Sequence, residues 1–87
     1  MDPIEKLQKI VSILNDPFSD CPQLTERERE AAKLAACGFK LKAMGKVMGI
    51  SVSTAGDYLS KVKKKIKLDK SQLTQALISK IVEVLKS

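Results

Sequence analysis

Serine, aspartate and lysine side chains recur along residues 52–67 at positions that share one side of a helix. The aliphatic residues of this segment, spaced four, three and four apart, are Ala55, Leu59, Val62 and Ile66. If these face a core, the opposite side carries Ser53, Gly56, Asp57, Ser60, Lys61 and Lys64. Serine hydroxyls donate or accept hydrogen bonds, aspartate accepts from the amino group of cytosine, and lysines bind phosphates. The spacing therefore predicts a helix over 52–67 that contacts DNA.

The residues before this segment predict a shorter helix joined to it by a tight turn. Over residues 40–48 the apolar side chains at helical spacing are Leu41, Met44, Val47 and Met48. Gly49 can adopt the positive φ that ends a helix, and Ser51 or Ser53 can accept a hydrogen bond from the amides that begin the next one. Two helices joined in this way form a helix-turn-helix, which places its second helix in the major groove.

Positive charge is concentrated on this helix pair. Residues 40–70 contain nine lysines against two aspartates, whereas residues 1–39 carry a net charge of −2 and the whole chain +6. A localised basic region favours a polyanionic partner. The alternative is that the lysines only solvate a helix surface, so the charge supports the DNA hypothesis without carrying it.

Residues 24–38 predict a well-delimited supporting helix. Thr25 and Glu28 have the spacing of a capping box, and Gly38 provides a C-terminal stop. The expected inward residues are small, namely Ala31, Ala32, Leu34 and Ala35. Neighbouring helices must therefore approach closely, with the flexible side chains of Met44 and Met48 filling the remaining space.

An N-terminal helix is predicted over residues 3–15, with residues 1–16 forming an appended unit. Its apolar stripe is Ile4, Leu7, Val11 and Leu14, widened by Ile10 and Ile13. Two heptads are too few for a stable coiled coil, so the stripe must pack either on this domain or on a second subunit. A loop over 17–23 follows, and Phe18 is expected to anchor it to the core. The helix-turn-helix domain then occupies residues 24–87.

The last predicted helix spans residues 72–86. Its residues at intervals of four are Leu73, Leu77, Ile81 and Leu85. This apolar surface is wider than one small domain needs, so it serves either the core or a dimer interface. With few turn residues and long runs of good helix formers, the chain is predicted to be all-α, a small bundle of about five helices.

Several function classes are disfavoured by what the sequence lacks. It contains no histidine, no glycine-rich phosphate loop, and no cysteine or serine with a base beside it, so we expect no enzyme, cofactor or metal site. It has neither a membrane-spanning run nor a secretory signal pattern, which predicts a cytoplasmic protein. Cys21 and Cys37 are expected to be reduced thiols, Cys21 in a loop and Cys37 packed as a small apolar residue.

Between Leu24 and Leu68 the chain carries a family pattern without a gap. The matching residues are Leu24, Thr25, Arg27, Glu28, Glu30, Leu34, Ala36, Gly38, Lys42, Ile50, Ser51, Thr54 and Lys65. On these residues the segment resembles the DNA-binding domain of the LuxR/NarL/FixJ/GerE family of bacterial transcription regulators. The resemblance implies a four-helix domain whose third helix enters the major groove. It also implies a homodimer, formed through the fourth helix, on inverted half-sites of double-stranded DNA.

The resemblance assigns phosphate contacts to Thr54 and Lys42, beside those expected of Lys61, Lys64, Lys65 and the Tyr58 hydroxyl. The base-reading positions depart from the family: Gly56 replaces a basic residue, Tyr58 a histidine and Lys61 an asparagine. Gly45 also stands in place of an alanine. A glycine inside a helix costs roughly 1 kcal/mol relative to alanine. Gly56 therefore marks either a close approach of the backbone to DNA or a loss of base reading.

Three functions compete at this point. The leading hypothesis is a DNA-binding transcription regulator acting as a dimer. The second is a protein-interaction module, such as a heterodimerising inhibitor, that keeps the fold but reads DNA weakly or not at all. The third is an element similar to region four of sigma factors that binds RNA polymerase, which fits residues 24–30 less well.

Overall fold

Helices are the regular elements of residues 2–87, which the computed structural model describes. They are α1 (Pro3–Asn15), α2 (Glu26–Ala36), α3 (Leu41–Met48), α4 (Val52–Ile66) and α5 (Lys70–Lys86). The predicted all-α class with about five helices is confirmed. The boundaries agree with the predicted segments to within a few residues.

Local capping residues set these boundaries. The Thr25 N–H donates to Glu28 Oε1 at 2.8 Å, and the Glu28 N–H donates back to Thr25 Oγ1 at 3.2 Å, which completes the predicted capping box. Gly38 has φ 89° and ends α2 as expected. Helix α5 begins at Lys70 rather than at residue 72, because Asp69 and Gln72 form a second capping box.

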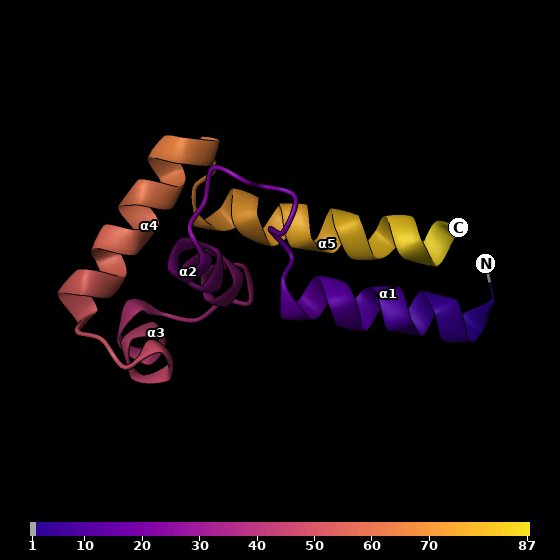
Figure 1. Ribbon diagram of the computed structural model, residues 1–87, viewed down its shortest axis with the longest axis horizontal. Coiled ribbons are helices and arrows are strands. Elements are labelled where there is room, and N and C mark those ends of the chain that lie inside the picture. Colours follow the sequence, from indigo (N-terminus) through magenta and orange to yellow (C-terminus); the bar gives the residue numbers. More distant parts are fainter. Residues whose placement is uncertain (1) are drawn as a thin grey trace.

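Helix α2 lies at the centre of the molecule and packs against α3, α4 and α5 (Figure 1). Helix α1 packs mainly on α5, and the two run antiparallel as a pair that extends away from α4 (Figure 1). The start of α1 and the end of α5 lie at the same end of that pair. Helix α4 is therefore at one extreme of the fold and the α1–α5 pair at the other.

The core is built from aliphatic side chains around the alanine-rich face of α2. Its buried members are Phe18, Leu24, Ala31, Ala32, Leu34, Ala35, Ala36, Met44, Met48, Ala55, Val62, Leu73 and Leu77. Met44 and Met48 fill space beside the alanines, as the sequence predicted. Phe18 anchors the interhelical loop, and the Lys80 ammonium lies 5.1 Å from its ring centroid.

Two apolar side chains of α3, and the cysteine that follows α2, are exposed. Leu41 and Val47 leave 36% and 56% of their surface in solvent, because α3 has only eight residues and packs through Met44, Gly45 and Met48. Cys37 was predicted to pack as a small apolar residue, and this prediction was wrong. It caps the C-terminus of α2 and faces solvent there, whereas Cys21 is half-buried in the loop.

Candidate nucleic-acid interface

The inner side of α4 is the one that the sequence predicted. Ala55 and Val62 are fully buried, and Leu59 and Ile66 are half-buried against the same core. Because residues three and four apart share one side of a helix, this packing turns the polar residues outward. The predicted orientation of α4 is confirmed.

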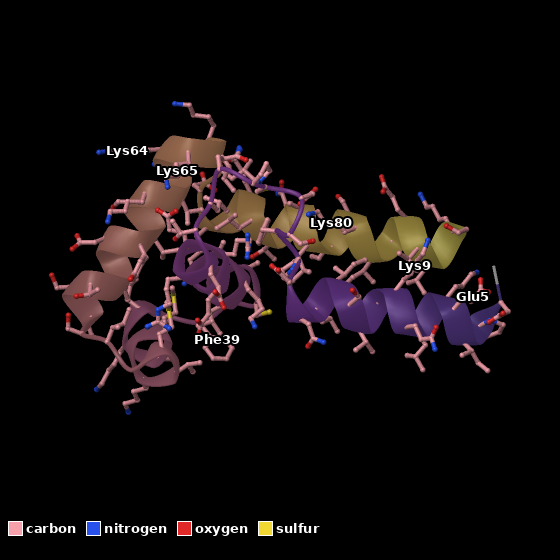
Figure 2. The ribbon with its side chains drawn as sticks, viewed as in Figure 1. Glu5, Lys9, Phe39, Lys64, Lys65 and Lys80 are labelled. Atoms are coloured by element: carbon pink, nitrogen blue, oxygen red, sulfur yellow. The ribbon has the colours of Figure 1, made fainter. Side chains whose placement is uncertain are left out.

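The outer side of α4 is open to solvent. Its exposed residues are Ser53, Asp57, Ser60, Lys61 and Lys64, and Gly56 is half-buried among them. Within residues 2–87 no helix packs over this side, since α1 lies on α5 at the other end of the fold (Figure 1). The Lys64 side chain extends away from the ribbon (Figure 2). The predicted base-facing residues are thus presented together on one accessible surface.

The start of α4 separates the roles of Ser51 and Thr54. Ser51 Oγ accepts the Thr54 N–H at 3.1 Å and donates its own proton to Thr54 Oγ1 at 2.9 Å. Ser51, one of the residues predicted to bind DNA, is therefore the N-cap of α4, and its hydroxyl is used within the chain. Thr54 accepts from Ser51 and keeps its own hydroxyl proton, which can be donated to a phosphate.

The turn between α3 and α4 depends on a close contact at Gly45. A methyl group added at Gly45 would lie 2.7 Å from the carbonyl oxygen of Ile50, closer than van der Waals contact allows. The Ile50 N–H in turn donates to the Gly45 carbonyl at 2.9 Å, and Gly49 has φ 70°. The glycine at position 45 thus has a structural reason, which is the close packing of the turn.

Arg27 joins α2 to the end of α3. Its guanidinium donates to the Met48 carbonyl at 2.9 Å and to Glu30 Oε2 at 3.1 Å. Met48 is the last residue of α3, where carbonyls lack partners within the helix. The sequence pattern contained Arg27 but did not reveal this role, because the contact spans 21 residues.

Lys65 is exposed, but its ammonium is paired with a residue of α2. The Lys65 Nζ lies 2.7 Å from Oε1 of Glu28, whose side chain is only 3% exposed. The Lys65 side chain points back toward α2 (Figure 2). Desolvation raises the pKa of Glu28, but hydrogen bonds from Lys65 and from Thr25 outweigh it, so this pKa lies below its ordinary value. Lys65 thus fixes α4 on α2, and the phosphate contact predicted for it would compete with this ion pair.

The remaining predicted contacts lie at the edges of the surface. Tyr58 is half-buried against the core, and the Lys61 ammonium lies 5.8 Å from its ring centroid. Lys42 is exposed on α3. An open hollow near the end of α4, which sequence reasoning missed, is lined by Ser60, Lys63, Lys64 and Lys67. The run of lysines at 63–65 was the available signal for Lys63.

The predicted dimerisation stripe on α5 is divided by the fold. Leu73 and Leu77 are buried in the core, Ile81 is half-buried and Leu85 is exposed. Leu73 and Leu77 are therefore not available to a second subunit. The physical reason is that the alanine face of α2 leaves space that bulky leucines of α5 fill.

Comparison of the chain with protein-family models, curated proteins and solved structures found no match. Among residues 2–87 there is no cluster of three or more histidine, cysteine or acidic side chains placed to bind a metal ion. In the same part of the chain, none of the helices combines the length and the apolar character needed to cross a membrane. The interface therefore has to be interpreted from its own geometry.

Proposed function

We propose that this protein is a DNA-binding transcription regulator of the LuxR/NarL/FixJ/GerE type that acts in the bacterial cytoplasm and places α4 in the major groove. The observation that carries the proposal is the open, polar and lysine-bearing outer side of α4. Its inner side is fixed by the core, by the turn at Gly45 and by the ion pair between Lys65 and Glu28. A helix held this rigidly can present side chains to base edges at a constant register.

The charge distribution along α4 supports this orientation. The first half of the outer side carries Ser53 and Asp57, whereas the second half carries Lys61 and Lys64 and continues to Lys67. In a helix-turn-helix, the N-terminal part of the recognition helix contacts bases and the flanks contact phosphates. Asp57 then accepts from a cytosine amino group, and the lysines bind the backbone.

Gly56 fits a close approach of DNA to α4. A methyl group added there would meet only Leu41 Cδ1, at 3.9 Å, which is an ordinary van der Waals distance. The packing within the chain therefore does not require a glycine at this position, in contrast to Gly45. A nucleic-acid backbone or base edge close to α4 supplies a reason for it.

Binding of duplexes selected from a random pool tests the proposal. Lys64→Ala should weaken all sequences together by several-fold and reduce the slope of log affinity against log salt by about 1. The matched control is Lys86→Ala, which removes an exposed lysine at the far end of α5 and should leave affinity unchanged. Asp57→Ala should alter the preference at one base pair. Folded protein that binds no duplex at low salt would contradict the proposal.

The second candidate function is a protein-interaction module with the same fold. It is favoured by the exposed carboxylate of Asp57, which repels phosphates, and by the absence of a side chain at Gly56. Its partner would be another regulator or RNA polymerase. Nanomolar, competitor-resistant DNA binding by the protein alone would exclude it.

A further inference from the structure

The most regular apolar stripe of α1 is not the side of the helix that packs on α5. Helix α1 has no fully buried residue, and it rests on α5 through Ile10 and Ile13, which are half-buried. The stripe with heptad-like spacing remains in solvent: Ile4 is 69% exposed, Leu7 62%, Val11 49% and Leu14 45%. Helix α5 also has exposed apolar residues next to its buried side, namely Ile78, Val82 and Leu85.

The two apolar stripes lie on the same side of the α1–α5 pair. A groove on the other side is lined by polar residues of both helices: Lys9, Ser12 and Asp16 from α1, and Lys80, Glu83 and Ser87 from α5. At 100° per residue, the residues that contact the other helix lie between two sides of each helix. The groove residues are on one of these sides, and the apolar stripe is on the other. Since both helices direct their polar residues to one side, both direct their apolar residues to the other. Figure 2 labels two groove lysines, Lys9 on α1 and Lys80 on α5.

We propose that this combined face, made of Ile4, Leu7, Val11, Leu14, Ile78, Val82 and Leu85, binds the same face of a second copy of this chain. The resulting dimer would be a four-helix bundle of two antiparallel pairs. This face differs from the stripe predicted on α5 alone, because it needs α1 and leaves Leu73 and Leu77 in the core.

The area of the face is that of a dimer interface. The exposed parts of its seven side chains equal roughly four fully exposed aliphatic residues, on the order of 400 Å² of apolar surface. A standard interface buries about 800 Å² on each partner, somewhat more than half of it apolar. The rims of the two helices supply the remaining polar area.

The charge pattern favours a second copy over a different protein. The chain has a net charge of +6, so two copies repel one another wherever lysines meet. The seven residues of the face include no charged side chain, whereas Lys9, Lys80 and Glu83 line the groove on the other side. A copy can therefore dock through this face alone without opposing lysine to lysine at its centre.

Sedimentation equilibrium of the full chain without DNA, from about 1 to about 500 µM, tests the inference. We expect a monomer–dimer equilibrium in which Val11→Glu raises the dissociation constant at least about a hundredfold, since it buries an unpaired charge. The matched control is Ser12→Glu, which adds the same charge one residue away on the groove side and should change the constant by less than about threefold. Circular dichroism checks that each variant is folded.

Ile4→Glu repeats the test in the first turn of α1, where the residue is 69% exposed, so the substitution removes little packing within the chain. A wild-type chain that stays monomeric to about 500 µM would overturn the inference, as would equal weakening by Val11→Glu and Ser12→Glu. A trimer or larger assembly would overturn it as well.

One consequence rests on the proposed function. A two-fold dimer relates its two copies of α4 by the same symmetry that relates inverted half-sites on DNA, and Figure 1 shows that α4 of each copy lies away from the free end of the α1–α5 pair. Val11→Glu should then abolish cooperative binding to a paired site and leave binding to a single half-site unchanged. Failure of dimerisation is detected without DNA, and failure of DNA binding is detected on the single half-site, so the two proposals can fail separately.

Discussion

Helix α4 and the α1–α5 pair each leave one side in solvent, and the two free sides have opposite chemistry. The side of α4 carries serines, an aspartate and lysines, whereas the side of the pair is aliphatic and uncharged. A polar, lysine-bearing face is stably hydrated when free, and its binding to a polyanion weakens as the salt concentration rises. When another apolar surface covers an aliphatic face, both are removed from water and the free energy of the system falls. This difference is the basis for proposing two separate partners, DNA for α4 and a second copy of the chain for the pair.

The two regions also differ in how firmly they are held. Helix α4 has two fully buried residues, an ion pair to Glu28 and a turn with no free space at Gly45. Helix α1 has no fully buried residue and leaves its regular stripe open. The proposed recognition helix needs a fixed angle, whereas under the proposed dimerisation α1 completes its packing on the second copy. The α1–α5 pair is therefore the region whose stability should depend on protein concentration.

Substitution of Gly45 is expected to have the largest effect that is confined to one of the two regions. Gly45→Ala places a methyl group against the Ile50 carbonyl, which is backbone and cannot move away easily. We expect the free energy of unfolding to fall by about 2 kcal/mol, because overpacking outweighs the gain in helix propensity. Urea denaturation measures this change. DNA binding should fall with it while the dimerisation constant is unchanged, and a loss of both would mean that the two regions are coupled.

A smaller loss is expected when the ion pair that fixes α4 is broken. Lys65→Met should lower the free energy of unfolding at pH 7 by about 1–2 kcal/mol, because it leaves Glu28 buried without its partner while Lys65 itself was partly exposed. Lys64→Met is the matched control. It should leave stability unchanged and weaken DNA binding.

The same variant has a defined pH dependence. The pKa of Glu28 in the folded protein lies below its ordinary value of 4.5, so the pair contributes fully above that pH and its contribution is lost as the pH falls through the folded pKa. Urea denaturation of wild type and Lys65→Met should therefore give free energies that converge in acid. A difference that stays constant down to acid pH would rule out the ion pair as the cause.

The smallest expected effect has the opposite sign. Gly56→Ala should raise the free energy of unfolding by about 1 kcal/mol, because alanine favours the helix and the added methyl group makes only an ordinary contact with Leu41. DNA affinity should fall if the duplex lies close to α4 there, and dimerisation should not change. Thermal denaturation and duplex titration measure the two quantities. Unchanged affinity would favour loss of base reading at Gly56.

The sequence by itself determined the helices and the orientation of α4. Thr25, Glu28, Gly38 and Gly49 act on amides or backbone angles within a few residues, so their effects can be predicted without knowledge of the fold. Helix α4 has one aliphatic side and one polar side, which left a single way to bury it.

Only the tertiary structure decided which apolar side the other helices bury. Helix α1 has two candidate sides and packs through Ile10 and Ile13, while α5 gives Leu73 and Leu77 to α2 and keeps Ile78 exposed. The partners of Lys65 and Arg27 and the contact at Gly45 were decided in the same way. A periodic pattern shows that a surface needs covering, but the shape of the neighbouring helix decides what covers it.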